Sequence, residues 1–137
     1  ALVVADRSAA EALGMTVIAE ILSYGQTAGP DTSLQAQPAN ALGIALKKAD
    51  LGVNDLDLVE INEAFAAVSL YSANLLGIPH DRVNVNGGAI ALGHPLGASG
   101  ARIVVTLISA LRARGGGIGG AALCGGGGQG DALIVRV

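Results

Sequence analysis

Hydrophobic positions along the chain follow two periods, one typical of helices and one typical of strands. Leu42, Leu46 and Ala49 follow the i, i+4, i+7 spacing of an amphipathic helix, which predicts a helix over residues 39–48. Pro38 suits the first turn of this helix. Short apolar runs rich in branched side chains predict strands instead. The predicted strands are residues 1–5, 16–24, 56–61, 83–85, 118–124 and 132–137, and the predicted helices are residues 6–13, 39–48, 63–76 and 98–114. This order of elements predicts a layered α/β domain.

The last third of the chain carries the clearest amphipathic pattern. In the helix predicted for residues 98–114, Leu107 and Leu111 belong to an apolar stripe, and Arg102 falls largely elsewhere on the helix surface. The two strands that follow are separated only by the glycine-rich residues 125–130. A link this short predicts an antiparallel hairpin.

Residues 84–100 interrupt the pattern with a run that is rich in glycine. Glycine disfavours helices and strands because it loses more conformational freedom on folding than any other residue. Such a run suits positive φ angles or a close approach of the backbone to another group. His94 lies near its centre, Pro95 follows, and a helical pattern begins soon afterwards. We interpret the run as an active-site loop that leads into a helix.

Composition and charge limit the classes of protein that fit. The chain has 137 residues, of which 51% are hydrophobic and 14% charged, a balance typical of α/β domains whose central strands are buried on both faces. A net charge of −3 offers no basic footprint for nucleic acid. There is no Lys/Arg-rich amphipathic stretch, and no apolar run reaches the roughly 18 residues that cross a bilayer. We therefore expect neither a nucleic-acid nor a membrane partner.

A lone cysteine, Cys124, excludes a disulfide within the chain and fits a reducing compartment. We expect a cytoplasmic location. The chain begins with Ala1 inside an apolar run, which suggests a fragment or a processed piece of a longer protein.

Three polar residues are predicted to lie where elements meet. Asn62 ends a strand and opens a helix, His94 lies in the glycine-rich loop, and Cys124 ends a strand. Open α/β sheets place ligand sites beyond the carboxyl ends of their strands, so these junctions can converge on one crevice. Each residue also has a structural interpretation: Asn62 as a helix N-cap, His94 as a loop residue bonded to backbone, and Cys124 as a small core residue. The glycines after Cys124 favour a functional role, because bare backbone admits a substrate and offers N–H donors to an oxyanion.

Other candidate sites are weaker. The loop glycines do not form a dinucleotide-binding or phosphate-binding pattern. Two histidines and one cysteine far apart in sequence are a poor metal set, so no metal is expected. His80, after Pro79, is interpreted as a surface histidine. Glu63 either supports the first turn of the helix predicted from residue 63 or orients a neighbouring group, and the first interpretation is favoured.

Three motifs together resemble the thiolase family. They are Asn-Glu-Ala-Phe-Ala at residues 62–66, the loop at residues 86–100, and Cys-Gly-Gly-Gly-Gly-Gln-Gly at residues 124–130, in the order the family has them. The resemblance covers the whole chain but only the carboxyl-terminal third of a typical member. It implies the C-terminal β-α-β-α-β-β half of a five-layer αβαβα thiolase fold. Residues 1–15 would then be the end of the family's amino-terminal half, and residues 16–137 its C-terminal domain.

The resemblance also implies acyl transfer between coenzyme A thioesters, either thiolysis of a 3-ketoacyl-CoA or the reverse Claisen condensation, in fatty acid metabolism. Coenzyme A would be a substrate, and no cofactor would be bound permanently. Family enzymes hold the acyl group on a cysteine of the amino-terminal half, so this chain alone is expected to be inactive. The implied partners are acyl-CoA substrates, the amino-terminal half and further copies in a dimer or tetramer.

Site residues carry over from the family by position. Cys124 matches the acid/base cysteine, whose task needs a thiol pKa near the working pH. His94 matches the histidine that activates the absent nucleophile and stabilises the enolate oxygen. Asn62 matches the residue that fixes the water of that oxyanion hole. The remaining matches are Gly126, whose N–H lines the second oxyanion hole, and Ala64 and Phe65, which would touch the pantetheine arm.

One departure and two alternatives stay open. Where many members carry Met-Gly before the helix of residues 39–48, this chain has Leu34-Gln35, which leaves acyl length and branching undefined. A non-catalytic acyl-CoA or lipid-binding protein is the main alternative, although it has no use for a paired acid/base thiol. A ketoacyl synthase would usually carry a histidine at the position of Cys124.

Overall fold

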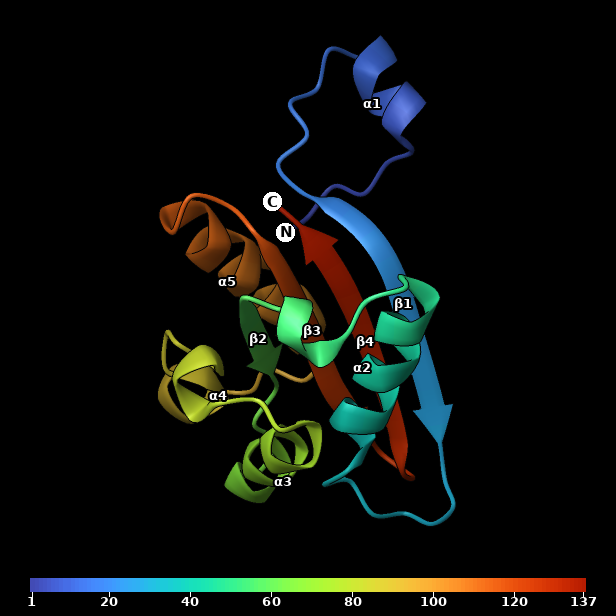
Figure 1. Ribbon diagram of the computed structural model, residues 1–137, viewed down its shortest axis with the longest axis vertical. Coiled ribbons are helices and arrows are strands. Elements are labelled where there is room, and N and C mark those ends of the chain that lie inside the picture. Colours follow the sequence, from blue (N-terminus) through green and yellow to red (C-terminus); the bar gives the residue numbers. More distant parts are fainter.

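A computed structural model describes all residues from 1 to 137, and its centre is one four-stranded sheet (Figure 1). The strands lie in the order β1-β4-β3-β2. β3 and β4 form the predicted antiparallel hairpin, β1 pairs antiparallel with β4, and β2 pairs parallel with β3. The strand bounds are β1 Glu20–Ala28, β2 Leu58–Ile61, β3 Ile118–Gly125 and β4 Gln129–Arg136. The α/β prediction is confirmed.

The helices lie on both faces of this sheet and beyond one of its ends. α2 lies against one face and α5 against the other, while α3 and α4 gather near the end toward which β2 points (Figure 1). None of them is long and apolar enough to cross a bilayer. The bounds are α1 Arg7–Ala12, α2 Gln37–Lys48, α3 Ala66–Leu76, α4 Gly88–Leu92 and α5 Ser99–Ala113, with 3-10 turns at Val53–Asp55 and His80–Arg82.

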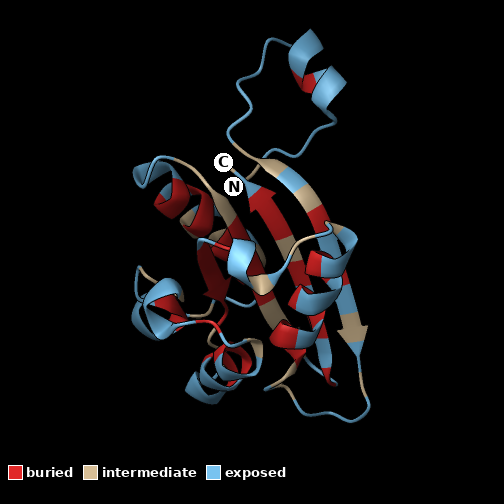
Figure 2. Ribbon diagram, in the orientation of Figure 1, coloured by how far each residue is buried: buried red, intermediate tan, exposed pale blue.

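Two hydrophobic clusters hold these layers together, one on each face of the sheet. Leu58 of β2 packs with Leu107 and Leu111 of α5, whereas its neighbour Val59 packs with Leu42 of α2. Successive side chains of a strand point to opposite faces, so β2 is buried along its whole length. Figure 2 shows the buried residues gathered in the sheet and on the inner sides of α2 and α5. Burial of each of these aliphatic side chains stabilises the folded state by about 1.5–3 kcal/mol relative to leaving it exposed.

α2 approaches the sheet closely because β1 carries a glycine beneath it. A Cβ atom added at Gly25 would collide with the carbonyl oxygen of Ala41 and come 2.7 Å from the amide nitrogen of Ala45. Ser23 lies two residues earlier on the same strand, and its Oγ donates to the Ala45 carbonyl at 2.7 Å. Packing of α2 against β1 therefore depends on the absence of a side chain at residue 25.

The first predicted strand is wrong, and the second begins later than expected. Residues 1–5 form no strand; Val3 and Val4 are 79% and 74% exposed, and no neighbouring strand supplies hydrogen bonds. β1 begins at Glu20 because that residue faces Arg136, the last residue of β4. β1 continues to Ala28, through residues predicted as loop, because β4 accompanies it that far.

Residues 83–100 also differ from the prediction. Val83 makes only a single bridge to Val59, because Asn84 turns into the left-handed region at φ 49° and ends the pairing. The short helix α4 then forms inside the predicted loop.

Candidate active site

Asn62 lies at the carboxyl end of β2 and is completely buried. Its amide nitrogen donates to the carbonyl oxygen of Ala122 on β3 at 2.9 Å, which fixes its backbone at the edge of the ladder. The interpretation of Asn62 as an N-cap is wrong, since α3 begins at Ala66 and Phe65 occupies the cap position. The Asn62 side chain is thus free of a capping role and faces the glycine-rich loop.

His94 and Asn62, distant in sequence, are brought together. The side-chain nitrogen of Asn62 lies 3.4 Å from both ring nitrogens of His94. Ser99 Oγ, at the start of α5, lies 2.6 Å from His94 Nδ1 and donates to the Pro95 carbonyl at 3.1 Å. A hydroxyl has one proton to give, so Ser99 accepts from Nδ1–H. This assignment of the tautomer leaves Nε2 as the nitrogen that can receive a proton.

A second residue from the start of α5, Arg102, contacts the Asn62–His94 pair through Asn62. The guanidinium of Arg102 donates to Oε2 of Glu60 at 3.0 Å and to Oδ1 of Asn62 at 3.4 Å. Arg102 therefore does not lie largely on the helix surface as predicted; only 18% of its side chain is exposed. The reason is that Glu60, on the β2 face that packs against α5, draws the guanidinium inward.

Glu60 is the most strongly perturbed acid of the site. Burial raises the pKa of its carboxyl to about 7, although Arg102 acts in the opposite direction, and the nearby charge of Glu63 adds to the rise. A carboxyl that is 2% exposed loses its water shell, and one ion pair does not fully replace it. The charge on Glu60 is therefore poised to change near neutral pH.

Two further residues hold the glycine-rich loop against β2. Asn84 accepts from the Ile61 nitrogen and donates to the Ile61 oxygen, both at 2.8 Å, as a neighbouring strand would. Glu63 lies before the first turn of α3, so the favoured interpretation of helix support is wrong. It accepts from the amide of Ile90 in α4 at 2.9 Å, which agrees with the alternative that it orients a neighbouring group. A Cβ at Gly88, where φ is 61°, would lie 2.7 Å from Glu63 Cδ. Asn84 and Ser99 were missed from sequence; an Asn-Gly-rich junction was the only signal for Asn84.

Cys124 lies at the same end of the sheet but on another side of it. β2 and β3 are parallel with Ile61 opposite Ala122, so Cys124 comes two residues beyond that pair. Its half-buried side chain packs against the cluster on the α2 face, and its sulfur has no hydrogen bond to His94 or Asn62. Burial raises the pKa of the Cys124 thiol, whereas the acid/base role expected from the sequence needs a thiol pKa near the working pH.

The other predicted site residues surround this end of the sheet. Gly126 is exposed in the β3–β4 turn, where Gln129 Nε2 donates to its carbonyl at 3.0 Å. Phe65 is 66% exposed just before α3, and Ala64 is partly exposed beside it. None of Ala64, Phe65 and Gly126 forms a hydrogen bond with the His94 ring.

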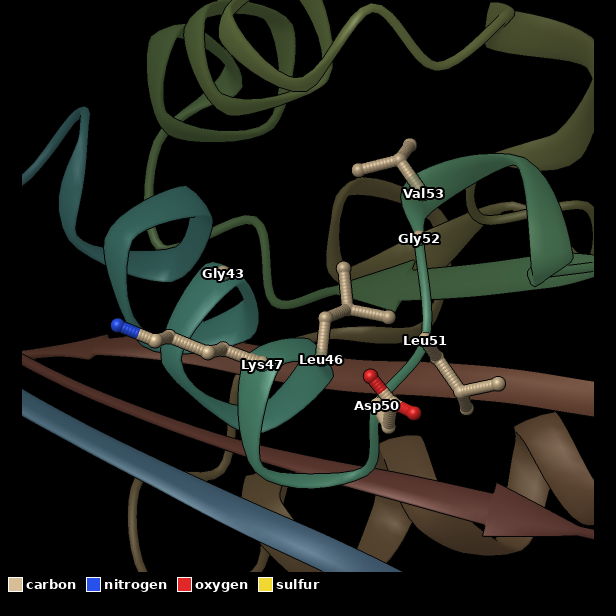
Figure 3. Close-up of a pocket in the computed structure, with 7 residues that line it drawn as sticks. All are labelled: Gly43, Leu46, Lys47, Asp50, Leu51, Gly52 and Val53. Carbon is tan, nitrogen blue, oxygen red and sulfur yellow. The ribbon is translucent and has the colours of Figure 1, made fainter.

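A separate hollow of the surface lies elsewhere. It measures about 560 Å³ and lies between the end of α2 and the turn before β2 (Figure 3). Its lining includes Leu46 and Val53, with the Lys47 amine pointing away from Asp50 (Figure 3). This turn precedes β2, whereas Asn62 follows it, so the hollow belongs to the opposite end of the strand. It contains none of the candidate site residues.

Asn62 and His94 lie together at the carboxyl edge of an α/β sheet. This places the chain among α/β proteins with a candidate acid/base site at that edge. Residues 15–137 match the family model described as thiolase, C-terminal domain. The chain therefore belongs to the thiolase family, and it has the fold of that family's C-terminal half.

Individual relatives agree with this assignment. The chain is 58% identical to a probable acetyl-CoA acetyltransferase of Mycobacterium leprae over 98% of its own length and 34% of the relative. It is 51% identical to the acetyl-CoA acetyltransferase of Escherichia coli over 99% of its length and 34% of that protein. The rat peroxisomal 3-ketoacyl-CoA thiolase B is 51% identical over 84% of the chain and 27% of the relative. The chain thus spans about a third of the curated relatives it matches.

Proposed function

We propose that this chain is the C-terminal catalytic domain of an acetyl-CoA acetyltransferase-like thiolase, which transfers acyl groups between coenzyme A thioesters. The observation that carries the proposal is the contact of Asn62 with a His94 ring whose Nδ1 proton is held by Ser99. Relatives named acetyl-CoA acetyltransferase support acetyl-CoA as a substrate, and acetoacetyl-CoA would be the 3-ketoacyl-CoA that is cleaved. The covalent nucleophile would come from the amino-terminal part of such an enzyme, and the chain alone would be inactive.

In thiolysis, the nucleophilic thiol of that part would give its proton to His94 Nε2 and attack the 3-keto carbon. The C2–C3 bond would then break and leave an acyl enzyme and the enolate of acetyl-CoA. The protonated Nε2 and a water held by Asn62 would stabilise the enolate oxygen. Cys124 would donate a proton to C2 and release acetyl-CoA, a step that suits a thiol whose pKa is raised by burial.

The second half of the cycle would reverse these proton transfers. The Cys124 thiolate would take the proton of the incoming coenzyme A thiol, which attacks the acyl enzyme. The Gly126 N–H would stabilise the oxyanion of this step, and His94 would return its proton to the departing nucleophile. Ala64 and the exposed Phe65 would contact the pantetheine arm. Coenzyme A would serve as a substrate throughout, without a resident cofactor.

We also propose how the chain fits into the larger enzyme. Residues 1–15 would belong to the end of the amino-terminal half, and residues 16–137 would form the domain. A groove of about 320 Å³ beside α5, lined by Ile103 and Leu133 among others, would receive part of that half. The complete enzyme would be a dimer or tetramer. A lone cysteine that must remain a thiol supports a cytoplasmic location.

The test uses a joined protein, in which this chain follows the amino-terminal two thirds of the M. leprae relative, since the chain corresponds to 34% of it. The joined protein is expected to cleave acetoacetyl-CoA only when coenzyme A is present, and the chain alone is expected not to. The measurement is the rate of acetoacetyl-CoA loss by absorbance. A folded joined protein that binds acetoacetyl-CoA without turnover would overturn the proposal in favour of an acyl-CoA-binding protein.

A further inference from the structure

Arg102 joins Asn62, which the proposed mechanism uses, to Glu60, which has no part in that mechanism. On one side its Nη1 donates to the buried Glu60 at 3.0 Å, and on the other its Nη2 donates to Asn62 Oδ1 at 3.4 Å. Ser99, one turn earlier on α5, bonds His94. The first turn of α5 thus reaches both members of the Asn62–His94 pair.

Stability alone is a poor explanation for the Glu60–Arg102 pair. Glu60 Oε1 and Arg102 Nε are buried and have no hydrogen-bond partner in the protein. An unpaired buried polar atom destabilises a fold, and a buried ion pair often stabilises it less than apolar side chains of similar size. The pair is therefore better explained by what it does to its neighbour.

That neighbour is the carboxamide of Asn62, which has two ends of opposite character. Its oxygen accepts hydrogen bonds and its nitrogen donates them, whereas a guanidinium can only donate. Arg102 therefore pairs only with Oδ1, and this turns the NH2 group toward the His94 ring, 3.4 Å away. With the amide reversed, the NH2 group would face the guanidinium, and an oxygen without protons would face the unprotonated Nε2 of His94.

We propose that Arg102, anchored by Glu60, is a positioning residue that fixes the orientation of the Asn62 carboxamide toward His94 and the substrate. The inference rests on the proposed function, because it assigns a purpose to the direction in which the Asn62 NH2 group points. Arg102 acts only through Asn62 and does not touch the reacting atoms.

The test is a double-mutant cycle in the joined protein, with thiolysis of acetoacetyl-CoA as the readout. Arg102→Met is expected to lower kcat by roughly 10- to 100-fold, the scale of a small misplacement in an active site, with KM nearly unchanged. Asn62→Ala is expected to lower kcat as well. In the Asn62→Ala background, Arg102→Met is expected to lower kcat no further, because the group that it orients is gone.

Two controls separate positioning from folding. Arg112→Met removes an exposed arginine from the last turn of the same helix and is expected to leave kcat unchanged. If Arg102→Met alone fails to fold, the Glu60→Gln/Arg102→Met variant removes the unpaired buried charge and replaces it in the cycle, with the same expectation.

The outcomes distinguish this inference from the proposed function. If Asn62→Ala lowers kcat while Arg102→Met does not, or if the two losses multiply in the double variant, the inference is overturned and the proposed function stands. If the folded joined protein shows no thiolysis at all, the proposed function fails and the inference fails with it.

Discussion

Replacement of Cys124 by alanine is expected to lower kcat of the joined protein for acetoacetyl-CoA cleavage by about 10²- to 10⁴-fold, the usual contribution of a general acid/base. The thiol is proposed to protonate C2 of the leaving enolate and later to accept the proton of coenzyme A. Alanine keeps the Cβ atom in the half-buried site and removes only the sulfur. The loss should therefore appear in catalysis while the fold is retained, as steady-state kinetics and the circular dichroism spectrum will show.

A matched change tests whether the loss is specific. Ser99→Ala removes a hydroxyl that holds His94 and should lower kcat without abolishing it, because the imidazole remains. Should Cys124→Ala keep the kcat of the unmodified joined protein, Cys124 would have no acid/base role and would be a core residue.

Replacement of Gly25 by alanine is expected to destabilise the domain by more than about 3 kcal/mol, at the upper end of the cost of overpacking. The new methyl group would meet backbone atoms of Ala41 and Ala45, so α2 as a whole would have to move away from β1. The measurement is the midpoint of thermal or urea unfolding of the joined protein, compared with the unmodified form.

Gly43 of α2 supplies the matched control. A Cβ at this exposed helix position meets nothing within 4 Å. Gly43→Ala is expected to stabilise the helix by about 0.5–1 kcal/mol, since alanine is the better helix former. Equal unfolding midpoints for the Gly25 and Gly43 variants would show that α2 does not pack on β1 as described.

Much of the fold was predictable because each element carries its period locally. The stripe that includes Leu107 and Leu111 predicted α5 within a residue of its bounds, and the glycine-rich link predicted the β3–β4 hairpin. The bounds of β1 depend on something distant, the length of β4, which pairs with it from Glu20 to Ala28. No local pattern of the residues around Glu20 contains that information, and the prediction began four residues too early.

In the candidate site too, residues within local motifs were predictable, and residues that act through distant contacts were not. Motifs in the sequence predicted Asn62, His94 and Cys124 as site residues, and the structure joins the first two directly. The groups that hold them come from elsewhere in the chain. The helical pattern predicts Arg102 at the surface, but its ion pair with the buried Glu60 draws it inward. Arg102 donates to Glu60, which lies 42 residues earlier in the chain. The residues around Arg102 carry no pattern that indicates such a distant partner.

Cys124 and His94 do not contact each other through a hydrogen bond, and this makes their joint action testable. The two residues share one end of the sheet but have no direct bond, and the proposed mechanism requires them to act on one substrate within one cycle. Residues that act as a unit give strongly non-additive losses when both are removed.

The most direct measurement is therefore kcat for acetoacetyl-CoA cleavage by the joined protein with His94→Ala, with Cys124→Ala and with both. If the residues form one active site, the double variant will be about as slow as the slower single variant. A double variant whose loss is the product of the two single losses, or a single variant that keeps full activity, would contradict the account.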